Sequence, residues 1–364
     1  MTRRRAPLRA ACLVVALTAG LAGCATNSTP ARLHYGLGDA PEGKRIMWPP
    51  EPEPPRYQFA GQLTGEENFV REEGKSGVVG FLAWVVGLFE DESPNVLQRP
   101  QAVVGDGAGR IFVTDVSRAA VLVFDEPAGE LKVWEYAQGL RRFVAPIGIA
   151  VAADGGVWVA DAELGVIARL DRDGVPLAPI GYGMLQRPTG LARDPATGEL
   201  YVSDTHAHDI KVLAEDGRLL RTLGERGEAP GEFNFPTHLA IAGGKLYVTD
   251  TMNSRVQVFP LPEGEPQVVG QRGLYYGNLV RPKGVGVDSD RNVYIVESYY
   301  DNLLIFNEAG EFLMPIGGVG QSTGKFYLPS GVWVDPFDRV FVADTFNGRI
   351  TVFKYLGGAK ADGE

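Results

Sequence analysis

The sequence predicts an all-β fold, a six-bladed β-propeller whose blades each contain four antiparallel strands. Two observations lead to this fold: a phrase that begins with proline occurs six times, and two further apolar phrases follow each occurrence. The unit repeats roughly every 45 residues, which is typical of a propeller blade. The prolines that open the units are Pro100, Pro146, Pro188, Pro236, Pro282 and Pro329.

The apolar phrases have the composition of β-strands. The second phrase of each unit reads IFVTD, VWVAD, LYVSD, LYVTD, VYIVE or VFVAD, and the third has similar branched and aromatic residues. Such side chains suit a pleated, half-buried surface. Turn residues such as Asp106-Gly107 and Asp173-Gly174 separate the phrases, as in hairpins. No apolar period of 3.6 residues is present, which argues against a helical repeat.

The two ends of the repeat region predict how the ring closes. The sixth unit has no fourth strand, because the chain ends soon after its third phrase. A strand without a unit lies at the other end, at about residues 56–63 (RYQFAGQL). We expect this strand to complete the last blade, which removes the exposed edges of an open sheet. The propeller is predicted over residues 56–356, with a C-terminal tail at 357–364.

The N-terminus has the pattern of a secretory signal peptide. Arginines precede an apolar run too short to span a bilayer, and Leu21-Ala22-Gly23-Cys24 follows. These four residues resemble a bacterial lipobox, which implies cleavage of residues 1–23 and lipidation of Cys24. The alternatives are an uncleaved anchor or an ordinary signal peptide. Ala25 and Thr26 include no aspartate after the cysteine, which resembles the enterobacterial sorting pattern for the outer membrane. Whether the protein faces the periplasm or the cell surface is left open.

Two further segments lie outside the repeat. Residues 24–55 are rich in proline and predict a lipid-bearing, extended tether. Residues 77–90 (GVVGFLAWVVGLFE) form an apolar insert. We interpret this insert as a plug or short helix packed on the propeller. The alternative is a patch that faces the membrane or a partner.

Charge and cysteine content exclude several classes of function. The chain has 35 basic and 45 acidic residues, a net charge of −10, whereas nucleic-acid binding requires basic surfaces. Cys12 and Cys24 are the only cysteines, so the sequence contains no haem attachment motif and no cysteine zinc site.

Two segments carry a resemblance to a known family. Residues 251–259 (TMNSRVQVF) and 344–350 (DTFNGRI) resemble NHL-repeat signatures, and the resemblance extends over residues 57–356. Segments 235–241, 281–290 and 328–353 resemble, more narrowly, a group of bacterial lipoprotein propellers often encoded near multihaem c-type cytochromes. This resemblance implies an envelope protein, such as a multihaem cytochrome, as partner.

The second phrase of each unit ends in a carboxylate. These residues are Asp115, Asp161, Asp204, Asp250, Glu297 and Asp344. One carboxylate at the same place in every blade favours a structural role in the turn over a calcium site. Glu297 is the exception, because its side chain is longer.

Three histidines suggest a metal site. His206 and His208 follow the second strand of the third blade, and His238 begins the first strand of the fourth blade. Loops at these places open on one face, where three imidazoles could bind zinc or another divalent metal. The alternatives are buried turn residues or contacts for a protein partner at the rim. The NHL-type amidating lyase carries its zinc histidines directly after the repeat proline, and this sequence has none there, so that chemistry is not carried over.

The same face is predicted to bind a partner protein. Arginine and tyrosine are enriched at protein interfaces. The candidates are Arg187, Arg281, Lys283, Glu297, Tyr299 and Tyr300. No catalytic residue can be assigned, so the sequence favours a non-catalytic interaction scaffold. The alternative is a metal-dependent hydrolase or lyase at the channel mouth near the three histidines. A small channel would favour the scaffold, and imidazoles converging over a pocket would favour the enzyme.

Overall fold

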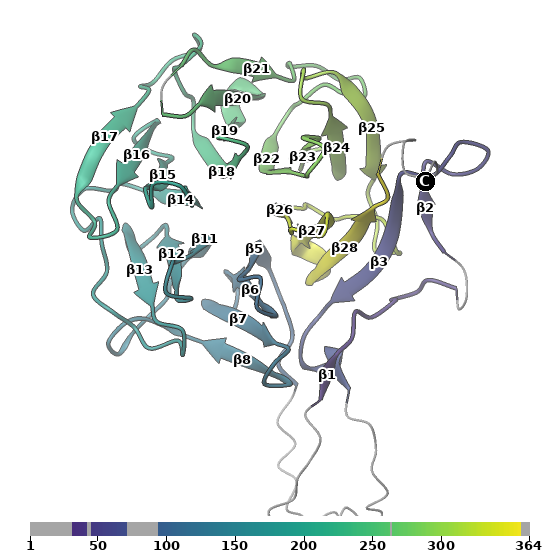
Figure 1. The fold of residues 1–364 in the computed structure, drawn as a ribbon, viewed down its shortest axis with the longest axis horizontal. Coiled ribbons are helices and arrows are strands. Elements are labelled where there is room, and N and C mark those ends of the chain that lie inside the picture. Colours follow the sequence, from purple (N-terminus) through teal and green to yellow (C-terminus); the bar gives the residue numbers. More distant parts are fainter. Residues whose placement is uncertain (1–30, 42–44, 71–93, 263, 358–364) are drawn as a thin grey trace, which may run out of the picture. The chain divides into compact units, whose positions relative to one another are not determined.

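The computed structural model describes residues 31–41, 45–70, 94–262 and 264–357, which form a ring of six blades around a central channel (Figure 1). The predicted all-β, six-bladed propeller is confirmed. The described ranges contain three short 3-10 turns, η1 (Glu66–Asn68), η2 (Thr251–Asn253) and η3 (Thr345–Asn347). Within these ranges, no helix has the length and apolar character needed to cross a bilayer. The apolar insert at 77–90 and Cys24 lie outside the described residues.

Each blade begins with its innermost strand and proceeds outward. Blade 1 contains β5 (Pro100–Gly105), β6 (Arg110–Asp115), β7 (Ala120–Asp125) and β8 (Glu130–Trp134). Blade 3 contains β14 (Pro188–Arg193), β15 (Leu200–Asp204), β16 (Asp209–Leu213) and β17 (Leu219–Leu223). Blade 4 contains β18 (Pro236–Ala242), β19 (Lys245–Asp250), β20 (Arg255–Pro260) and β21 (Gln267–Val269). Blade 5 contains β22 (Pro282–Val287), β23 (Val293–Glu297), β24 (Asn302–Phe306) and β25 (Phe312–Gly317).

Blade 2 has three strands rather than the expected four. These are β11 (Pro146–Val151), β12 (Val157–Asp161) and β13 (Val166–Leu170). At the fourth position, Pro176 and Ile180 make only isolated bridges to β13. Pro176 and Pro179 lack the N–H group that a continuous ladder requires, which explains the interruption. The short strands β9 (Tyr136–Gln138) and β10 (Arg141–Arg142) pair in the connection that leads into this blade.

The N-terminal strand closes the ring as predicted. β3 (Tyr57–Leu63) pairs antiparallel with β28 (Arg349–Tyr355), the third strand of blade 6. β27 (Arg339–Asp344) and β26 (Val332–Val334) complete the blade toward the channel. Residues from the two ends of the propeller therefore share one sheet, which leaves no unpaired edge at the join.

Part of the expected tether packs on the propeller instead of extending away from it. β2 (Met47–Trp48) adds a fifth strand to blade 6 by pairing with β3, and Trp48 lies 5.3 Å from Phe353 between ring centroids. β1 (Arg32–Leu33) pairs with β4 (Phe69–Val70). Apolar side chains such as Leu33 and Trp48 bury surface here, which a proline-rich composition does not reveal.

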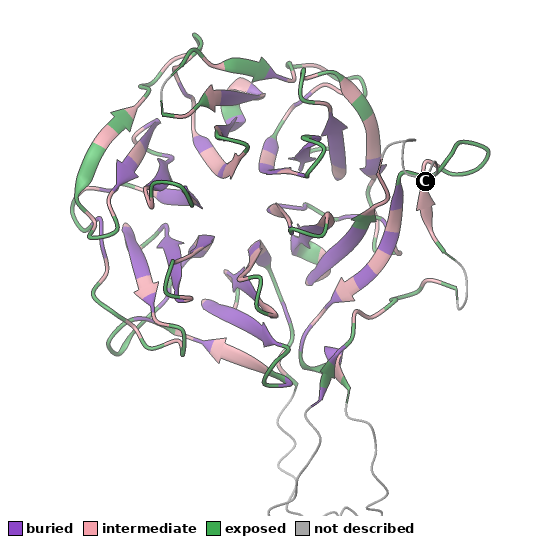
Figure 2. Ribbon diagram, viewed as in Figure 1, coloured by how far each residue is buried: buried purple, intermediate pink, exposed green. Residues whose placement is uncertain are grey.

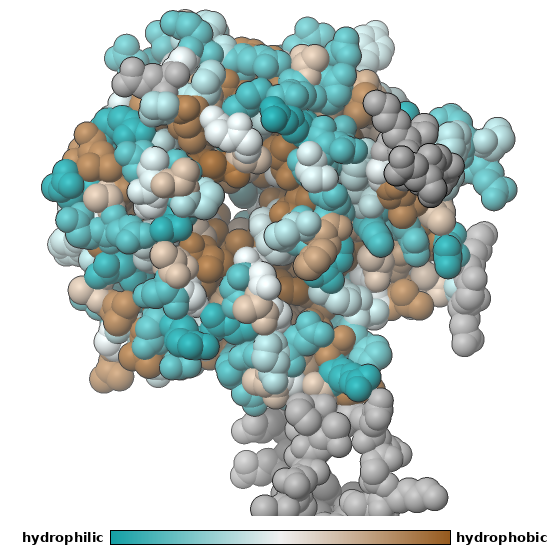
Figure 3. Space-filling view, viewed as in Figure 1, coloured by the Kyte–Doolittle hydropathy of each residue, from teal (hydrophilic) through white to brown (hydrophobic). Residues whose placement is uncertain are grey.

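The hydrophobic core lies between the blades. One cluster fills each seam; for example, Tyr247, Val258 and Val285 pack between blades 4 and 5. The second and third strands of the blades are mostly buried on both faces, so they read as continuous apolar runs (Figure 2). Figure 3 shows apolar surface around the hollow at the centre of the ring. This channel has a volume of about 240 Å³ and is lined by the first strands.

Candidate partner-binding site

The six repeat carboxylates hold the connections that lead into their own blades. In blade 1, the backbone N–H groups of Gln98 and Arg99 donate to Asp115 at 2.6 and 3.0 Å. In blade 5, the N–H groups of Val280 and Tyr299 donate to Glu297 at 2.7 and 2.9 Å. Asp161, Asp204, Asp250 and Asp344 accept equivalent bonds. These bonds give the carboxylates a structural role in the turns.

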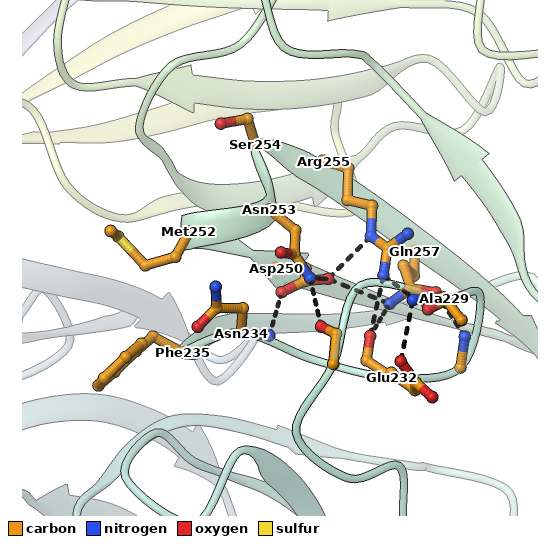
Figure 4. Close-up of polar contacts among 12 residues, drawn as sticks. Ala229, Glu232, Asn234, Phe235, Asp250, Met252, Asn253, Ser254, Arg255 and Gln257 are labelled. Carbon is orange, nitrogen blue, oxygen red and sulfur yellow. Dashed lines mark hydrogen bonds and ion pairs between the residues drawn. The ribbon is translucent and has the colours of Figure 1, made fainter.

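Blade 4 extends this arrangement into a network that anchors its incoming loop, residues 224–235 (Figure 4). Asp250 is fully buried and accepts hydrogen bonds from Asn253 at 2.9 Å and Arg255 at 2.8 Å. The Arg255 guanidinium also donates to the carbonyls of Ala229 and Glu232, at 2.8 and 2.9 Å. Arg255 therefore connects the incoming loop to the blade, because it pairs with the buried Asp250 and binds the loop carbonyls at the same time.

Gln257 adds a second attachment to the same loop. Its amide donates to the carbonyl of Glu232 at 2.7 Å, and its side-chain oxygen accepts the N–H of Gly231 at 2.9 Å. The side-chain amide of Asn253 donates to the carbonyl of Gly227 at 2.8 Å. Three side chains of blade 4 thus bind successive backbone groups of the loop.

Blade 6 repeats the arginine anchor. Arg349 donates to Asp344 at 2.8 Å and to the carbonyls of Ser322 and Lys325, at 3.3 and 2.9 Å. Asn347 donates to Asp344 at 2.8 Å and to the carbonyl of Gly320 at 2.9 Å. The asparagine and arginine of the repeat signature therefore have the same structural role in blades 4 and 6.

Blade 5 has different residues at these positions. Tyr300 replaces the asparagine, Asn302 the arginine and Leu304 the glutamine of blade 4. Tyr300, Asn302 and Leu304 line a cleft of about 700 Å³ between blade 5 and its incoming loop, residues 270–281. We call this space the blade-5 cleft. Its other lining residues are Trp48, Pro50, Leu274, Tyr275, Tyr276, Gly277, Asn278, Glu297, Pro315, Gly317, Gly318 and Lys325.

Exposed aromatic side chains surround the blade-5 cleft. Tyr275 and Tyr276 are 84% and 77% exposed, and Leu274 beside them is 76% exposed. Tyr299 is also exposed and packs edge-to-face on Tyr300, with ring centroids 4.9 Å apart. Exposed tyrosine and leucine side chains gathered at one concave place are typical of a protein-binding surface.

The predicted partner-binding residues divide into two groups. Tyr299, Tyr300 and Arg281 are exposed beside the cleft. Arg187 lies in the loop into blade 3, where its guanidinium pairs with Glu163 at 2.6 Å. Lys283 is half-buried, and burial lowers the pKa of its ammonium.

Glu297, the remaining predicted partner-binding residue, is buried in the wall of the cleft. Its side chain is only 1% exposed and accepts hydrogen bonds from backbone N–H groups. Burial raises the pKa of the carboxyl group above its ordinary range. The glutamate reaches back to the loop as the aspartates do, so it contributes to the wall of the cleft rather than to the open surface.

The three histidines predicted to bind a metal are not arranged as a metal site in the structure. Within the described ranges, no three His, Cys, Asp or Glu side chains are arranged to hold a metal ion. His208 accepts the N–H of Phe235 through Nδ1 at 3.3 Å, and its ring packs edge-to-face against Phe235. His238 lines the channel, where burial and the Lys283 charge lower its pKa to about 3. These three histidines therefore do not form the metal centre that the hydrolase or lyase alternative required.

Sequence reasoning missed most of the cleft. Leu274, Tyr275 and Tyr276 lie in a connection that has no strand pattern, and Trp48 belongs to the expected tether. A signal was present in the repeat itself: the Asn-x-Arg pattern of blades 4 and 6 is Tyr-x-Asn at residues 300–302.

Comparisons with known proteins agree with this architecture. The NHL repeat family model matches residues 233–259, which include Asp250, Asn253, Arg255 and Gln257 of the blade 4 network. A rat peptidylglycine alpha-amidating monooxygenase is 29% identical over 162 residues, 40% of this chain and 16% of that protein. NHL repeat-containing protein 3 from mouse is 28% identical over 169 residues, 40% of this chain. The matched region spans 46% of the mouse protein's length, so both relatives are matched over less than half of their length.

A solved structure has the same fold over most of this chain. It is an auxiliary nutrient binding protein from Bacteroides thetaiotaomicron, with a TM-score of 0.58 and 13% sequence identity. The superposition covers 73% of this chain and 71% of that one. Identity this low supports the fold alone. The chain is therefore a six-bladed β-propeller that contains an NHL repeat in its fourth blade.

Proposed function

We propose that this propeller is a non-catalytic interaction scaffold that binds a protein partner at the blade-5 cleft. The observation that carries the proposal is a group of exposed tyrosines that line a concave site, Tyr275, Tyr276 and Tyr300. Tyr299 packs on Tyr300 beside them. Tyrosine supplies a large contact area with little side-chain entropy to lose, so it is favoured in binding surfaces. The central channel, at about 240 Å³, is much smaller than the cleft.

The proposal includes a lipid anchor at Cys24 on an extracytoplasmic chain. The basic, apolar and small-residue order of residues 1–24 supports it. The expected destination is the outer membrane. Metabolic labelling with a fatty acid should modify the wild-type protein and not a Cys24→Ser variant. Labelling of both proteins, or of neither, would reject the anchor.

The proposed partner is an envelope protein, and the resemblance to lipoprotein propellers suggests a multihaem c-type cytochrome. A photoreactive amino acid in place of Tyr276 should cross-link this partner in intact cells. Haem staining of the cross-linked band distinguishes a cytochrome from another envelope protein. A photoreactive residue at Tyr182, an exposed tyrosine in the loop into blade 3, is the matched control. Equal cross-linking from both positions would reject the cleft as the specific site.

A further inference from the structure

In blades 4 and 6, an arginine side chain occupies a space between the blade and its incoming loop. In blade 5, no equivalent side chain occupies this space. Arg255 and Arg349 each connect the repeat carboxylate of their blade to carbonyl groups of the incoming loop. The equivalent position in blade 5 is Asn302, whose side chain is too short to span this distance. Asn302 and the carboxylate-bearing Glu297 both line the blade-5 cleft. The cleft thus lies where the guanidinium group is bound in the neighbouring blades.

The carbonyl groups that would accept an arginine are already in place. In blade 4, Ala229 accepts both the Arg255 guanidinium and the N–H of Glu232, the latter at 3.0 Å. In blade 5, the equivalent turn is present, because the N–H of Asn278 donates to the carbonyl of Tyr275 at 2.9 Å. A carbonyl oxygen has two lone pairs, so Tyr275 can accept a second hydrogen bond, as Ala229 does.

The walls of the cleft suit a cation. Tyr275, Tyr276, Tyr300 and Trp48 line it, and aromatic faces attract guanidinium groups. Glu297 supplies a carboxylate that accepts backbone N–H groups and forms no salt bridge among the described residues, although the charge of Arg281 acts on it. Lys325 also lines the cleft, but its ammonium donates to the carbonyl of Gly317 at 2.8 Å. The net charge of −10 favours approach by a basic partner.

We propose that the blade-5 cleft binds an arginine side chain of the partner protein, which completes blade 5 as Arg255 and Arg349 complete their own blades. This inference rests on the proposed function and specifies the chemistry of the partner. Arginine fits better than lysine, because its planar fork of donors matches a carboxylate and two carbonyls held at fixed positions.

The test uses the full chain with N-acetyl-arginine amide as the probe. The readout is the change in tryptophan fluorescence, to which Trp48 in the wall of the cleft contributes. The neutral citrulline analogue has nearly the same shape and is the matched ligand control. A ligand of this size is expected to bind with a Kd on the order of 1 mM. Saturable binding of the arginine probe, with at least tenfold weaker binding of the citrulline analogue, is the expected result.

Two variants test the position of the probe. Asn302→Arg restores the internal arginine and should abolish probe binding, whereas Tyr182→Ala should not change it. If Asn302→Arg unfolds, Glu297→Gln serves as the second variant, because it removes the carboxylate charge at nearly constant volume. This variant should weaken probe binding at least tenfold. Equal binding of both ligands, or binding unchanged in both cleft variants, would overturn the inference.

The same variants separate this inference from the proposed function. In one outcome, position 276 still cross-links to a partner when the protein also carries Asn302→Arg and when it carries Glu297→Gln. That result would support the scaffold function and would reject the binding of an arginine in the cleft. Loss of cross-linking in both variants, with probe binding also lost, supports both proposals. If N-acetyl-aspartate amide binds and the arginine probe does not, the cleft binds an acidic ligand through Lys325. This result would overturn the inference.

Discussion

Blades 4 and 5 share one backbone plan and differ at a few side chains. Both begin at a proline, and both receive a loop of equal length, at residues 224–235 and 270–281. In blade 4, Asn253, Arg255 and Gln257 tie that loop to the blade. In blade 5 the three positions are changed and a cleft is present. The comparison teaches that a repeat protein can open a cleft in one unit by losing structural side chains there while keeping the fold.

The largest expected effect comes from removing the repeat carboxylates. Asp250→Ala leaves the Arg255 guanidinium and several donors of blade 4 without their acceptor, so it should lower the free energy of unfolding by about 3–5 kcal/mol. Glu297→Ala removes an acceptor of backbone N–H groups only, and should cost about 1–3 kcal/mol. Urea unfolding of both variants measures the difference. Equal losses would mean that the blade 4 network adds no stability.

Removing the arginine anchor should have the next largest effect. Arg255→Ala breaks the ion pair with the buried Asp250 and two hydrogen bonds to the loop, so we expect a loss of about 2–3 kcal/mol. Asn302→Ala at the equivalent position of blade 5 should change stability by less than about 0.5 kcal/mol. The same urea titration compares the two variants. A large loss in Asn302→Ala would contradict the view that this position no longer anchors the loop.

The buried glutamate predicts a pH dependence specific to blade 5. Burial raises the folded-state pKa of Glu297 above its ordinary value of 4.5, so the folded protein holds this proton more tightly than the unfolded chain. The stability contributed by the group is therefore lost as the pH rises from about 4.5 to the folded-state pKa.

Glu297→Gln lacks this titration. The free energy of unfolding of the wild type minus that of the variant should therefore decrease across this pH window and stay constant above it. Urea unfolding at several pH values measures this difference in free energy. The control is Glu228→Gln, which changes an exposed glutamate in the loop into blade 4. A difference that increases with pH would have the wrong sign and reject the assignment.

The smallest effect is local and leaves global stability unchanged. The N–H of Gly231 donates to Gln257, whereas Leu304 at the equivalent place in blade 5 offers no acceptor to Gly277. Amide hydrogen exchange should therefore be faster for residues 273–278 than for residues 227–232. Mass spectrometry of the two peptides compares their rates. Similar protection would indicate that other contacts hold the blade 5 loop equally firmly.

The sequence by itself determined the ring. Strand composition and turn residues are local properties, so the six units and the closing strand at 57–63 could be predicted from the printed residues. The structural role of Asp115 and its equivalents follows in the same way, because a carboxylate at a turn binds nearby N–H groups. Blade 2 departs from the pattern at Pro176, where the missing N–H was also visible in the sequence.

Only the tertiary structure decided where the candidate site lies. The packing of Trp48 on Phe353 joins residues about 300 positions apart, which no local pattern encodes. The order of strands and loops predicts that the three histidines lie on one face of the propeller. In the structure, Phe235 packs against His208, whereas His238 lines the channel. The replacement of the arginine at position 255 by Asn302 in the next repeat can be read from the sequence. It produces a cleft only because an aromatic loop and Trp48 border the space that the shorter side chain leaves.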